Sequence, residues 1–491
     1  MYNKLSDKHF DKETLVMGLR NYIYSFFSFS VGTWLGALLS FFTTPIISYL
    51  IVPDEFGRAS MFTLVYSIIY TVVTLGLDQS FVRFYYEIDE EKRKSLFWEC
   101  VAIPTVLSFI VMIPFLWSEK KISVLLFQRY YPYIGLLLLL SLISGVFQRF
   151  NSLSVRMRKK GFAFSTIHII SSVANAVCTI LYAKFVSADF YAVVAGQIAG
   201  NIFSLAYGFI YDKNNRKLAK VSLHNIRKYI KYGIPFLPTF LVSWLFSSMD
   251  RIALRQYSTF TEMGLYSAAF KLVSVMNLVQ TGFTMAWVPM SYEKYSKQPE
   301  NTDFYRKVFL TISLVMYTFG LAVIGFKDII FLLFSKSYRD AAYIAPFLIL
   351  MPVMYSISEV TVVGINFKKK TYWHMLITVV SALANYIGNT LLVPILGGKG
   401  AAISTGLSYI VFFAMRTIIS EKLYPVKYDI SKIVVGDIVM VAVALIGTFR
   451  KGMTTSILSA GVGILVILWL YKSEVKSLFS TFKTEFLASK N

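Results

Sequence analysis

The chain has 491 residues, of which 56% are hydrophobic and only 15% are charged, and its mean hydropathy is +0.58. Soluble domains keep about a quarter of their residues charged, so this composition excludes an ordinary soluble enzyme or binding domain. The net charge of +22 suggests a nucleic-acid partner at first sight. The basic residues collect in short joints between apolar runs, however, which is typical of membrane topology.

The first twenty residues are polar and have neither the apolar region nor the cleavage site of a signal peptide. We therefore expect a cytoplasmic lead-in, followed by a first apolar run that serves as an uncleaved signal anchor. This start sets the orientation of every later span.

Apolar runs of about 17–25 residues then recur, and each can cross a hydrocarbon core of roughly 30 Å. Runs such as "LLLLLSLISGVF" do not alternate between apolar and polar residues, which argues against a β-barrel. We predict an all-α polytopic membrane protein with about fourteen transmembrane helices. The predicted spans are 23–50, 59–77, 96–117, 132–148, 163–183, 190–211, 233–254, 264–288, 308–326, 341–364, 373–393, 400–419, 433–449 and 455–471.

The basic residues indicate the orientation of these spans. With the N-terminus inside, most of the 49 Lys and Arg residues fall in cytoplasmic segments, above all in Lys213–Lys231. Basic residues in short loops are retained on the cytoplasmic side. Both termini are therefore predicted to be cytoplasmic. The same segments attract anionic lipid, so no nucleic-acid partner is predicted.

The second half of the chain restarts near Arg227. "RNYIYSFFSFS" opens the first half and "RKYIKYGIPF" the second, and each leads into a long span with proline, a short acidic joint and then Gly57 or Gly264. Two parallel repeats of six spans are a common transporter plan, with the substrate site between the halves.

The repeats define a predicted domain organisation. Two spans remain after the second repeat and form a C-terminal addition. The predicted parts are a cytoplasmic lead-in (1–22), a first six-helix bundle (23–211), a basic cytoplasmic linker (212–232), a second six-helix bundle (233–420), two additional transmembrane helices (421–471) and a cytoplasmic tail (472–491).

The sequence contains no recognisable catalytic motif. Its four histidines do not form HExxH, and its two cysteines lie inside predicted spans. "GGKGAAISTG" resembles a phosphate loop, but it lacks the spacer before GK and the Ser or Thr after it. We therefore predict no metal site, no cofactor, no ATPase and no enzyme activity.

The stretch "DRIALRQYSTFTEMGLYSAAFKL" carries charges within an apolar region, and its "TEMGLYSAAF" echoes "DEFGRASMF" about 207 residues earlier. We interpret the echo as structural. Glu55 and Glu262 stand at helix entries, where an acidic group suits the positive end of the helix dipole. Gly57 and Gly264 permit a tight joint.

Three stretches resemble a known family. "GLDQSFVRFYYEIDEEKRKSLF" (76–97) is similar to the loop after the second span of bacterial polysaccharide-transport flippases, and "AWVPMSYEKY" (286–295) to the end of their eighth span. "DRIALRQYSTFTEMGLYSAAFKL" resembles the restart of their second half. These flippases belong to the multidrug/oligosaccharidyl-lipid/polysaccharide exporter superfamily, and the resemblance covers essentially the whole chain.

The resemblance implies two six-helix bundles around a central cavity and transport by alternating access. It implies that undecaprenyl-diphosphate-linked oligosaccharides are moved from the inner to the outer leaflet of the bacterial cytoplasmic membrane, for surface polysaccharide biosynthesis. Membrane lipids, glycosyltransferases and a polymerase are the partners to expect.

A diphosphate head group needs cationic partners along a hydrated passage, because charges inside membranes are costly unless paired or in water. Lys271 lies about seven residues into its span, roughly 10 Å deep, and Arg251 and Asp250 lie near the outer end of the preceding span. These three and Arg83 are candidate substrate contacts, and Glu359 is a candidate coupling-ion or proton site. Structural roles compete: a helix-end pair for Asp250 and Arg251, a topology charge for Arg83, snorkelling for Lys271 and a simple hydrogen bond for Glu359.

Other classes of protein remain open. A cation-coupled drug exporter of the same superfamily has the same pattern of spans, but acidic cavity residues would be expected for cationic drugs. A lipid-linked peptidoglycan precursor flippase is a close alternative. A sugar polymerase or ligase would be expected to carry a sizeable external loop, and no external segment exceeds about twenty residues.

Overall fold

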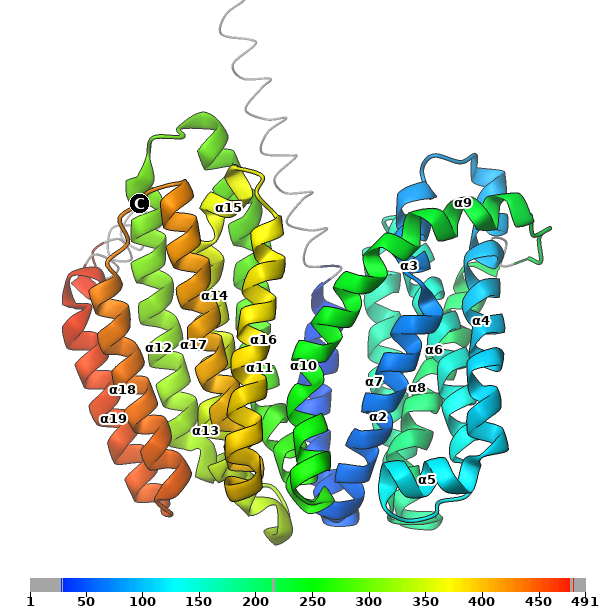
Figure 1. Cartoon of the computed structure of the whole chain (residues 1–491), viewed down its shortest axis with the longest axis horizontal. Helices are drawn as coiled ribbons and strands as arrows, with labels where there is room; N and C mark the ends of the chain where they lie inside the picture. Colours follow the sequence, from blue (N-terminus) through cyan, green and yellow to red (C-terminus); the bar gives the residue numbers. More distant parts are fainter. Residues whose placement is uncertain (1–27, 29, 214–216, 477–479, 481–491) are drawn as a thin grey trace, which may run out of the picture. The chain divides into compact units, whose positions relative to one another are not determined.

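A computed structural model describes residues 28, 30–213, 217–476 and 480 (Figure 1). All regular structure among these residues is helical, which confirms the predicted all-α fold. The predicted lead-in at 1–22 and most of the predicted tail lie outside the described residues. The chain divides into two compact units: unit 1 holds 1–43 and 65–238, and unit 2 holds 44–64 and 239–491.

The helices follow one another with short connections. After a first helix, Ser30–Leu50, come α2 (Pro53–Thr74), α3 (Leu77–Phe84), η1 (Glu90–Lys92), α4 (Arg93–Trp117), α5 (Glu119–Phe127), α6 (Ile134–Met157), α7 (Gly161–Phe185), α8 (Phe190–Tyr211), α9 (Leu223–Gly233) and η3 (Ile234–Phe236). There follow α10 (Leu237–Tyr257), α11 (Phe260–Lys297), α12 (Thr302–Leu332), η4 (Lys336–Tyr343), α13 (Ala345–Leu348), α14 (Leu350–Thr361), α15 (Val363–Phe367), α16 (Tyr372–Leu396), α17 (Gly398–Leu423), α18 (Ile430–Phe449) and α19 (Met453–Leu470).

Eleven described helices are long and apolar enough to cross a membrane. A twelfth span results if Lys336–Tyr343 and Ala345–Thr361, which meet at 52°, are taken together. The chain is therefore a multi-pass membrane protein. The count of fourteen is not confirmed, because α10 and α11 fall outside this set; their charged residues, such as Asp250 and Lys271, lower their hydropathy. Fourteen spans stay a prediction.

Unit 1 is built around α6, which packs against α4 and α8, while α7 packs along α8. Its core includes Phe81, Phe97 and Phe150, all fully buried. The short helix α9 runs across the ends of the other helices of this unit instead of along them (Figure 1). Close van der Waals packing stabilises such a core, because lipid tails are as apolar as these side chains and give no hydrophobic driving force between helices.

Helix α9 is fixed on one face and basic on the other. The Glu99 carboxylate of α4 accepts hydrogen bonds from the Ser222 backbone N–H (2.9 Å) and the Asn225 amide (3.1 Å) at the start of α9. At its end, Gly76 has a φ of +67°, and a Cβ there would lie 2.4 Å from the Gly233 carbonyl oxygen. The exposed face carries Arg227, Lys228 and Lys231. The role of this part of the chain as a cytoplasmic linker stays a prediction.

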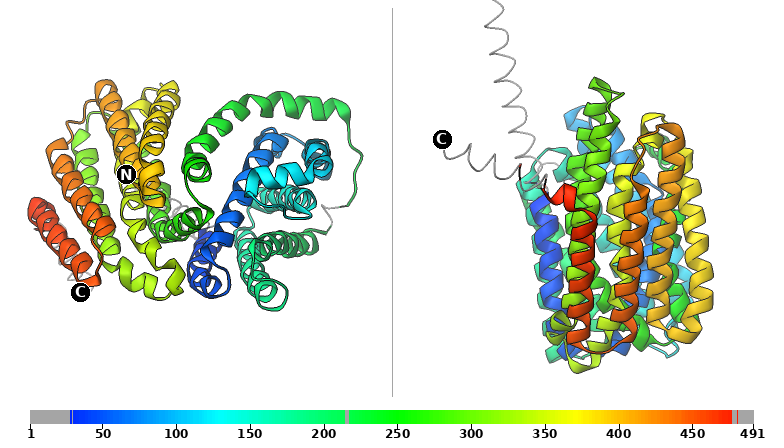
Figure 2. Two further views of the ribbon diagram at one scale, coloured as in Figure 1. Left: turned by 60° about the horizontal axis from the view of Figure 1, so that its bottom comes forward. Right: turned by 90° about the vertical axis from the view of Figure 1, so that its left-hand side faces the viewer.

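Unit 2 is organised around α17, which packs against α11, α13, α14, α15 and α16. Helix α19 lies beside α12 and α18 at the side of the unit (Figure 2). Helix α11 has 38 residues and is about 57 Å long at 1.5 Å per residue, so it extends beyond the thickness of a hydrocarbon core.

The two similar stretches of sequence, 54–62 and 261–270, contact each other within unit 2. A Cβ on Gly57 would lie 1.9 Å from the Phe260 carbonyl oxygen, and a Cβ on Gly264 would lie 1.9 Å from the Pro53 carbonyl oxygen. Ser267 donates a hydrogen bond of 2.9 Å to Ser60. The contact is thus reciprocal, with equivalent positions of the two repeats facing each other. Gly57 and Gly264 lie inside helices and not at tight joints, and they permit close approach of two backbones.

Candidate functional site

The side chain of Asp250, on α10, is buried in unit 2 and surrounded by neutral donors. The carboxylate accepts hydrogen bonds from the Tyr266 hydroxyl of α11 (2.6 Å) and the Thr405 hydroxyl of α17 (2.7 Å). The amides of Asn389 (2.9 Å) and Asn385 (3.1 Å), both on α16, complete the set. No ion pair to Asp250 occurs among the residues that the structure describes. Helices α10, α11, α16 and α17 therefore meet at one carboxylate whose described hydrogen-bond partners are all neutral.

This arrangement can hold a small cation. A buried carboxylate is costly unless its charge is balanced. Beside Asp250, the amide oxygen of Asn389 is buried and has no hydrogen-bond partner among the described residues, so it can serve as a second ligand for a cation. Hard cations are bound by such oxygen ligands. No group of three or more His, Cys, Asp and Glu residues suited to a metal occurs within the described ranges. One carboxylate among neutral oxygens suits a monovalent cation.

The two predicted cations of this region lie close together. Arg251 follows Asp250 on α10 and is partly exposed, and its charge interacts with that of Lys271. Lys271 is eleven residues beyond Phe260, where α11 begins, which is about 16 Å along the helix axis. Its depth in the membrane stays a prediction. The structure brings Asp250, Arg251 and Lys271 into one region of unit 2, where the described partners of Asp250 are neutral groups and do not include Arg251.

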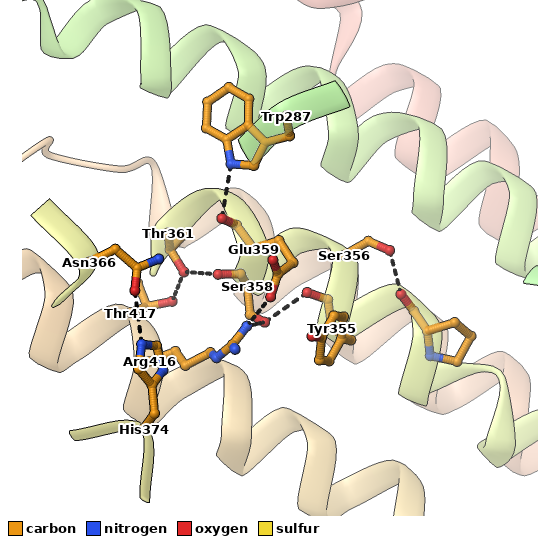
Figure 3. Close-up of polar contacts among 11 residues, drawn as sticks. Trp287, Tyr355, Ser356, Ser358, Glu359, Thr361, Asn366, His374, Arg416 and Thr417 are labelled. Carbon is orange, nitrogen blue, oxygen red and sulfur yellow. Dashed lines mark hydrogen bonds and ion pairs between the residues drawn. The ribbon is translucent and has the colours of Figure 1, made fainter. Parts of the chain in front are cut away.

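A second buried polar cluster surrounds Glu359 of α14 (Figure 3). Its carboxylate forms an ion pair of 2.6 Å with Arg416 of α17, and Arg416 also donates to the Ser358 hydroxyl at 3.0 Å. The guanidinium lies 4.5 Å from the ring centre of Phe412 and 5.2 Å from that of Tyr355. These contacts balance the charge of both side chains away from bulk water.

Further hydrogen bonds link the Glu359 cluster to α11 and to the C-terminal part of α17. The Trp287 indole N–H donates to the Glu359 carbonyl oxygen at 3.0 Å, and the hydroxyls of Thr361 and Thr417 lie 2.8 Å apart (Figure 3). A coupling cation at Glu359 would have to compete with Arg416. The coupling role of Glu359 stays a prediction.

Sequence reasoning missed Arg416. This residue lies within the predicted span 400–419, and an ionisable residue inside a span is itself a functional signal. Thr405 and Arg416 are eleven residues apart on α17, about 16 Å along its axis, with Tyr409 between them, its ring centre 5.7 Å from that of Phe412. Polar and aromatic groups therefore connect the two clusters through the interior of unit 2.

Unit 1 contains further ion pairs that involve arginine. Arg83 is exposed and forms an ion pair of 2.9 Å with Glu87. Arg149 of α6, which sequence reasoning also missed, donates to Asp78 at 2.7 Å, and 45% of its side chain is exposed. Its position one residue past the predicted span 132–148 explains the omission.

The helical architecture is that of a multi-pass membrane protein with polar side chains buried in unit 2. Residues 23–295 match the model of a family described as "Polysaccharide biosynthesis protein". This match covers more than half of the chain, and the chain belongs to that family. The family expected from the three quoted stretches is therefore confirmed.

One curated relative is the "Probable low-salt glycan biosynthesis flippase Agl15" of Haloferax volcanii, 22% identical over 249 residues. The match covers 50% of this chain and 52% of the relative, so the chain spans about half the length of that protein.

Two solved structures share the fold. A structure of "Lipid II flippase MurJ, inward closed conformation" has a TM-score of 0.68 at 18% identity and covers 92% of this chain and 99% of its own. An inward-facing "multidrug resistance MATE family transporter of the MOP superfamily" has a TM-score of 0.59 at 14% identity, covering 82% of this chain and 99% of its own. The chain shares the fold of these two structures.

Proposed function

We propose that the protein is a flippase that moves polyprenyl-diphosphate-linked oligosaccharides from the inner to the outer leaflet of the bacterial cytoplasmic membrane, for surface polysaccharide biosynthesis. The observation that carries this proposal is the match of residues 23–295 to a polysaccharide biosynthesis family. The glycan flippase named among its relatives supports it. In this role the protein is a transporter that catalyses no covalent chemistry.

The chemistry of the substrate fits the cations of unit 2. The lipid tail stays in the bilayer, whereas the diphosphate needs cationic partners on its way. Lys271 and Arg251 supply two neighbouring cations at membrane depth, and Arg83 is a further candidate in unit 1. The partners would be the lipid-linked oligosaccharide itself, membrane lipids, and glycosyltransferases and a polymerase that work beside the flippase.

We assign Asp250 to a coupling ion in preference to the substrate contact expected from the sequence. A carboxylate repels a diphosphate, and its ring of hydroxyl and amide groups suits a cation. An interior-negative potential favours outward movement of anionic charge by about 2.3 kcal/mol per charge per 100 mV, or roughly 4–5 kcal/mol for two charges. Transport by alternating access then needs no ATP hydrolysis by this chain.

Surface-polysaccharide complementation in a flippase-null bacterial strain tests the function. The wild-type chain should restore polymer at the cell surface, provided that the strain makes a lipid-linked oligosaccharide that the flippase accepts. A parallel strain depleted of its lipid-linked peptidoglycan precursor flippase, and a drug-sensitive strain, test the two alternatives. If the chain rescues the strain that lacks the peptidoglycan precursor flippase, or the drug-sensitive strain, and restores no surface polymer in any oligosaccharide background, the substrate is the peptidoglycan precursor or the drug instead.

A further inference from the structure

A pocket opens at one end of unit 2, where four connections converge. It has a volume of about 600 Å³ and is lined by residues of the α10–α11 turn, of η4, of the α16–α17 turn and of the α18–α19 turn. This volume lies within the range of small-molecule sites. The proposed topology places all four connections on the outer side of the membrane, at the far end of α11 from Trp287 and Glu359.

Three ammonium groups gather around a single aromatic ring beside this pocket. The ring centre of Tyr343 lies 4.3 Å from Lys327, 5.7 Å from Lys451 and 5.8 Å from Lys399. Lys399 also lies 5.8 Å from the Phe449 ring. Cations at about 6 Å from a ring centre are attracted to its face, but they repel one another, so their convergence needs nearby negative charge.

Each carboxylate of the region already has a partner, and two of these carboxylates, Glu262 and Asp340, line the pocket themselves. Asp328 pairs with Lys327 at 3.0 Å and accepts a hydrogen bond from Ser456 at 2.6 Å. Glu262 accepts the backbone N–H of Gly398 at 2.8 Å.

Asp340 reaches only Lys451, at 3.7 Å, and both side chains are mostly exposed. Within the described part of the chain, no carboxylate pairs with Lys399, which lines the pocket. The pocket therefore contains an ammonium group, that of Lys399, that contacts the Tyr343 and Phe449 rings and forms no direct ion pair among the described residues.

We propose that this pocket binds the phosphate group of a lipid at the outer surface of the membrane, with Lys399 as its principal contact and Lys451 as a secondary one. A phosphate is the acceptor that an ammonium group recognises as a point charge. Lys399 is in the first turn of α17, and the predicted span 400–419 would place it at the level of the lipid head groups.

Two sources can supply such a phosphate. One is the exported carrier lipid itself, which rests on the proposed function and would make the pocket a site of release. The other is an anionic phospholipid of the outer leaflet. Both present the same chemistry to Lys399, so the experiment separates them by competition.

The test uses a photoreactive polyprenyl diphosphate analogue on the purified full-length chain in nanodiscs of phosphatidylcholine, with cross-links mapped by mass spectrometry. Cross-links are expected in the segments 395–399 and 449–451. Lys399→Gln should raise the concentration for half-maximal labelling about tenfold, as expected when a charge-assisted contact is lost. Lys451→Gln should have a smaller effect, because Asp340 already offsets its charge.

Two control variants distinguish the loss of a phosphate contact from a general loss of folded structure. Asp340→Asn removes the competing carboxylate and should strengthen labelling, which a merely damaged fold would not do. Lys336→Gln removes an exposed lysine of η4 that does not line the pocket, and it should label as the wild type does.

The outcomes decide both the site and its source. Pocket labelling that phosphatidylglycerol displaces supports a site for anionic phospholipids, and labelling that it does not displace supports the exported carrier. No labelling of the pocket, or equal labelling of the wild type, Lys399→Gln and Asp340→Asn, overturns the inference. The readout needs no turnover, so a failure of transport leaves this result independent.

Discussion

Two buried carboxylates in unit 2 obtain their stabilisation differently. Glu359 is balanced by the guanidinium of Arg416 at 2.6 Å, whereas Asp250 is surrounded by hydroxyl and amide donors. Removing one partner of a buried ion pair leaves an uncompensated charge. A carboxylate whose partners are neutral hydrogen-bond donors keeps its negative charge, so a bound cation can stabilise it further.

Asp250→Asn should abolish cation-dependent stabilisation of the fold while keeping the shape of the site. A ligand at 100 times its dissociation constant stabilises the native state by about 2.7 kcal/mol, so the wild type should unfold at a higher temperature as sodium replaces a bulky organic cation. The measurement is the thermal unfolding midpoint of the purified protein against cation concentration. An Asn variant that responds as the wild type does would remove Asp250 as the ion site, and Glu359→Gln serves as the comparison.

Arg416→Met should destabilise the protein by about 3–5 kcal/mol, because Glu359 would be left buried without its partner. The double variant Arg416→Met with Glu359→Gln should recover part of this loss, since no buried charge then remains. The thermal unfolding midpoints of the two single variants and the double variant give the coupling free energy between Glu359 and Arg416. Additive losses would show that the pair does not act as a unit.

At the level of helices, the crossing of α2 and α11 requires glycine at both Gly57 and Gly264. Gly57→Ala and Gly264→Ala each place a Cβ 1.9 Å from a backbone carbonyl oxygen, which no side-chain rotation relieves. We expect both variants to lower the yield of folded protein in the membrane, measured by size-exclusion chromatography after extraction.

Gly461→Ala on α19 is the matched control, because nothing lies within 4 Å of its added Cβ. Alanine is favoured over glycine in a helix by about 1 kcal/mol, so this variant should be as stable as the wild type or more stable. Equal yields from all three variants would contradict the close crossing.

The sequence predicts long helices well because apolar length alone specifies them. The short helices α3, α5 and α9 and the bent η4–α13 segment carry no such signal, since tertiary contacts such as Glu99 with Asn225 form them. Asp250 and Arg251 are visible in the sequence as charges in an apolar region. Asn385, Asn389 and Thr405 are not, because the sequence does not show which face of an apolar span meets a carboxylate on another helix.

For the molecule as a whole, the basic residues predict which side of the membrane each connection occupies. A cysteine at Lys217, in an otherwise cysteine-free chain, should not react with an impermeant thiol reagent in intact cells. A cysteine at Lys451, whose side chain is 75% exposed in the structure, should react. Reaction at Lys217 with protection at Lys451 would invert the topology and place the phosphate pocket inside the cell.

The most direct test of the account is lipid flipping by the purified chain in proteoliposomes without nucleotide. A fluorescent polyprenyl-diphosphate oligosaccharide should move to the opposite leaflet, faster when a membrane potential favours the movement of anionic charge. Lys271→Ala should slow this movement sharply, Lys271→Arg should retain part of it, since either cation meets a phosphate, and Lys271→Glu should be slowest. Movement that requires ATP, or that is equally fast in Lys271→Glu and in the wild type, would contradict the account.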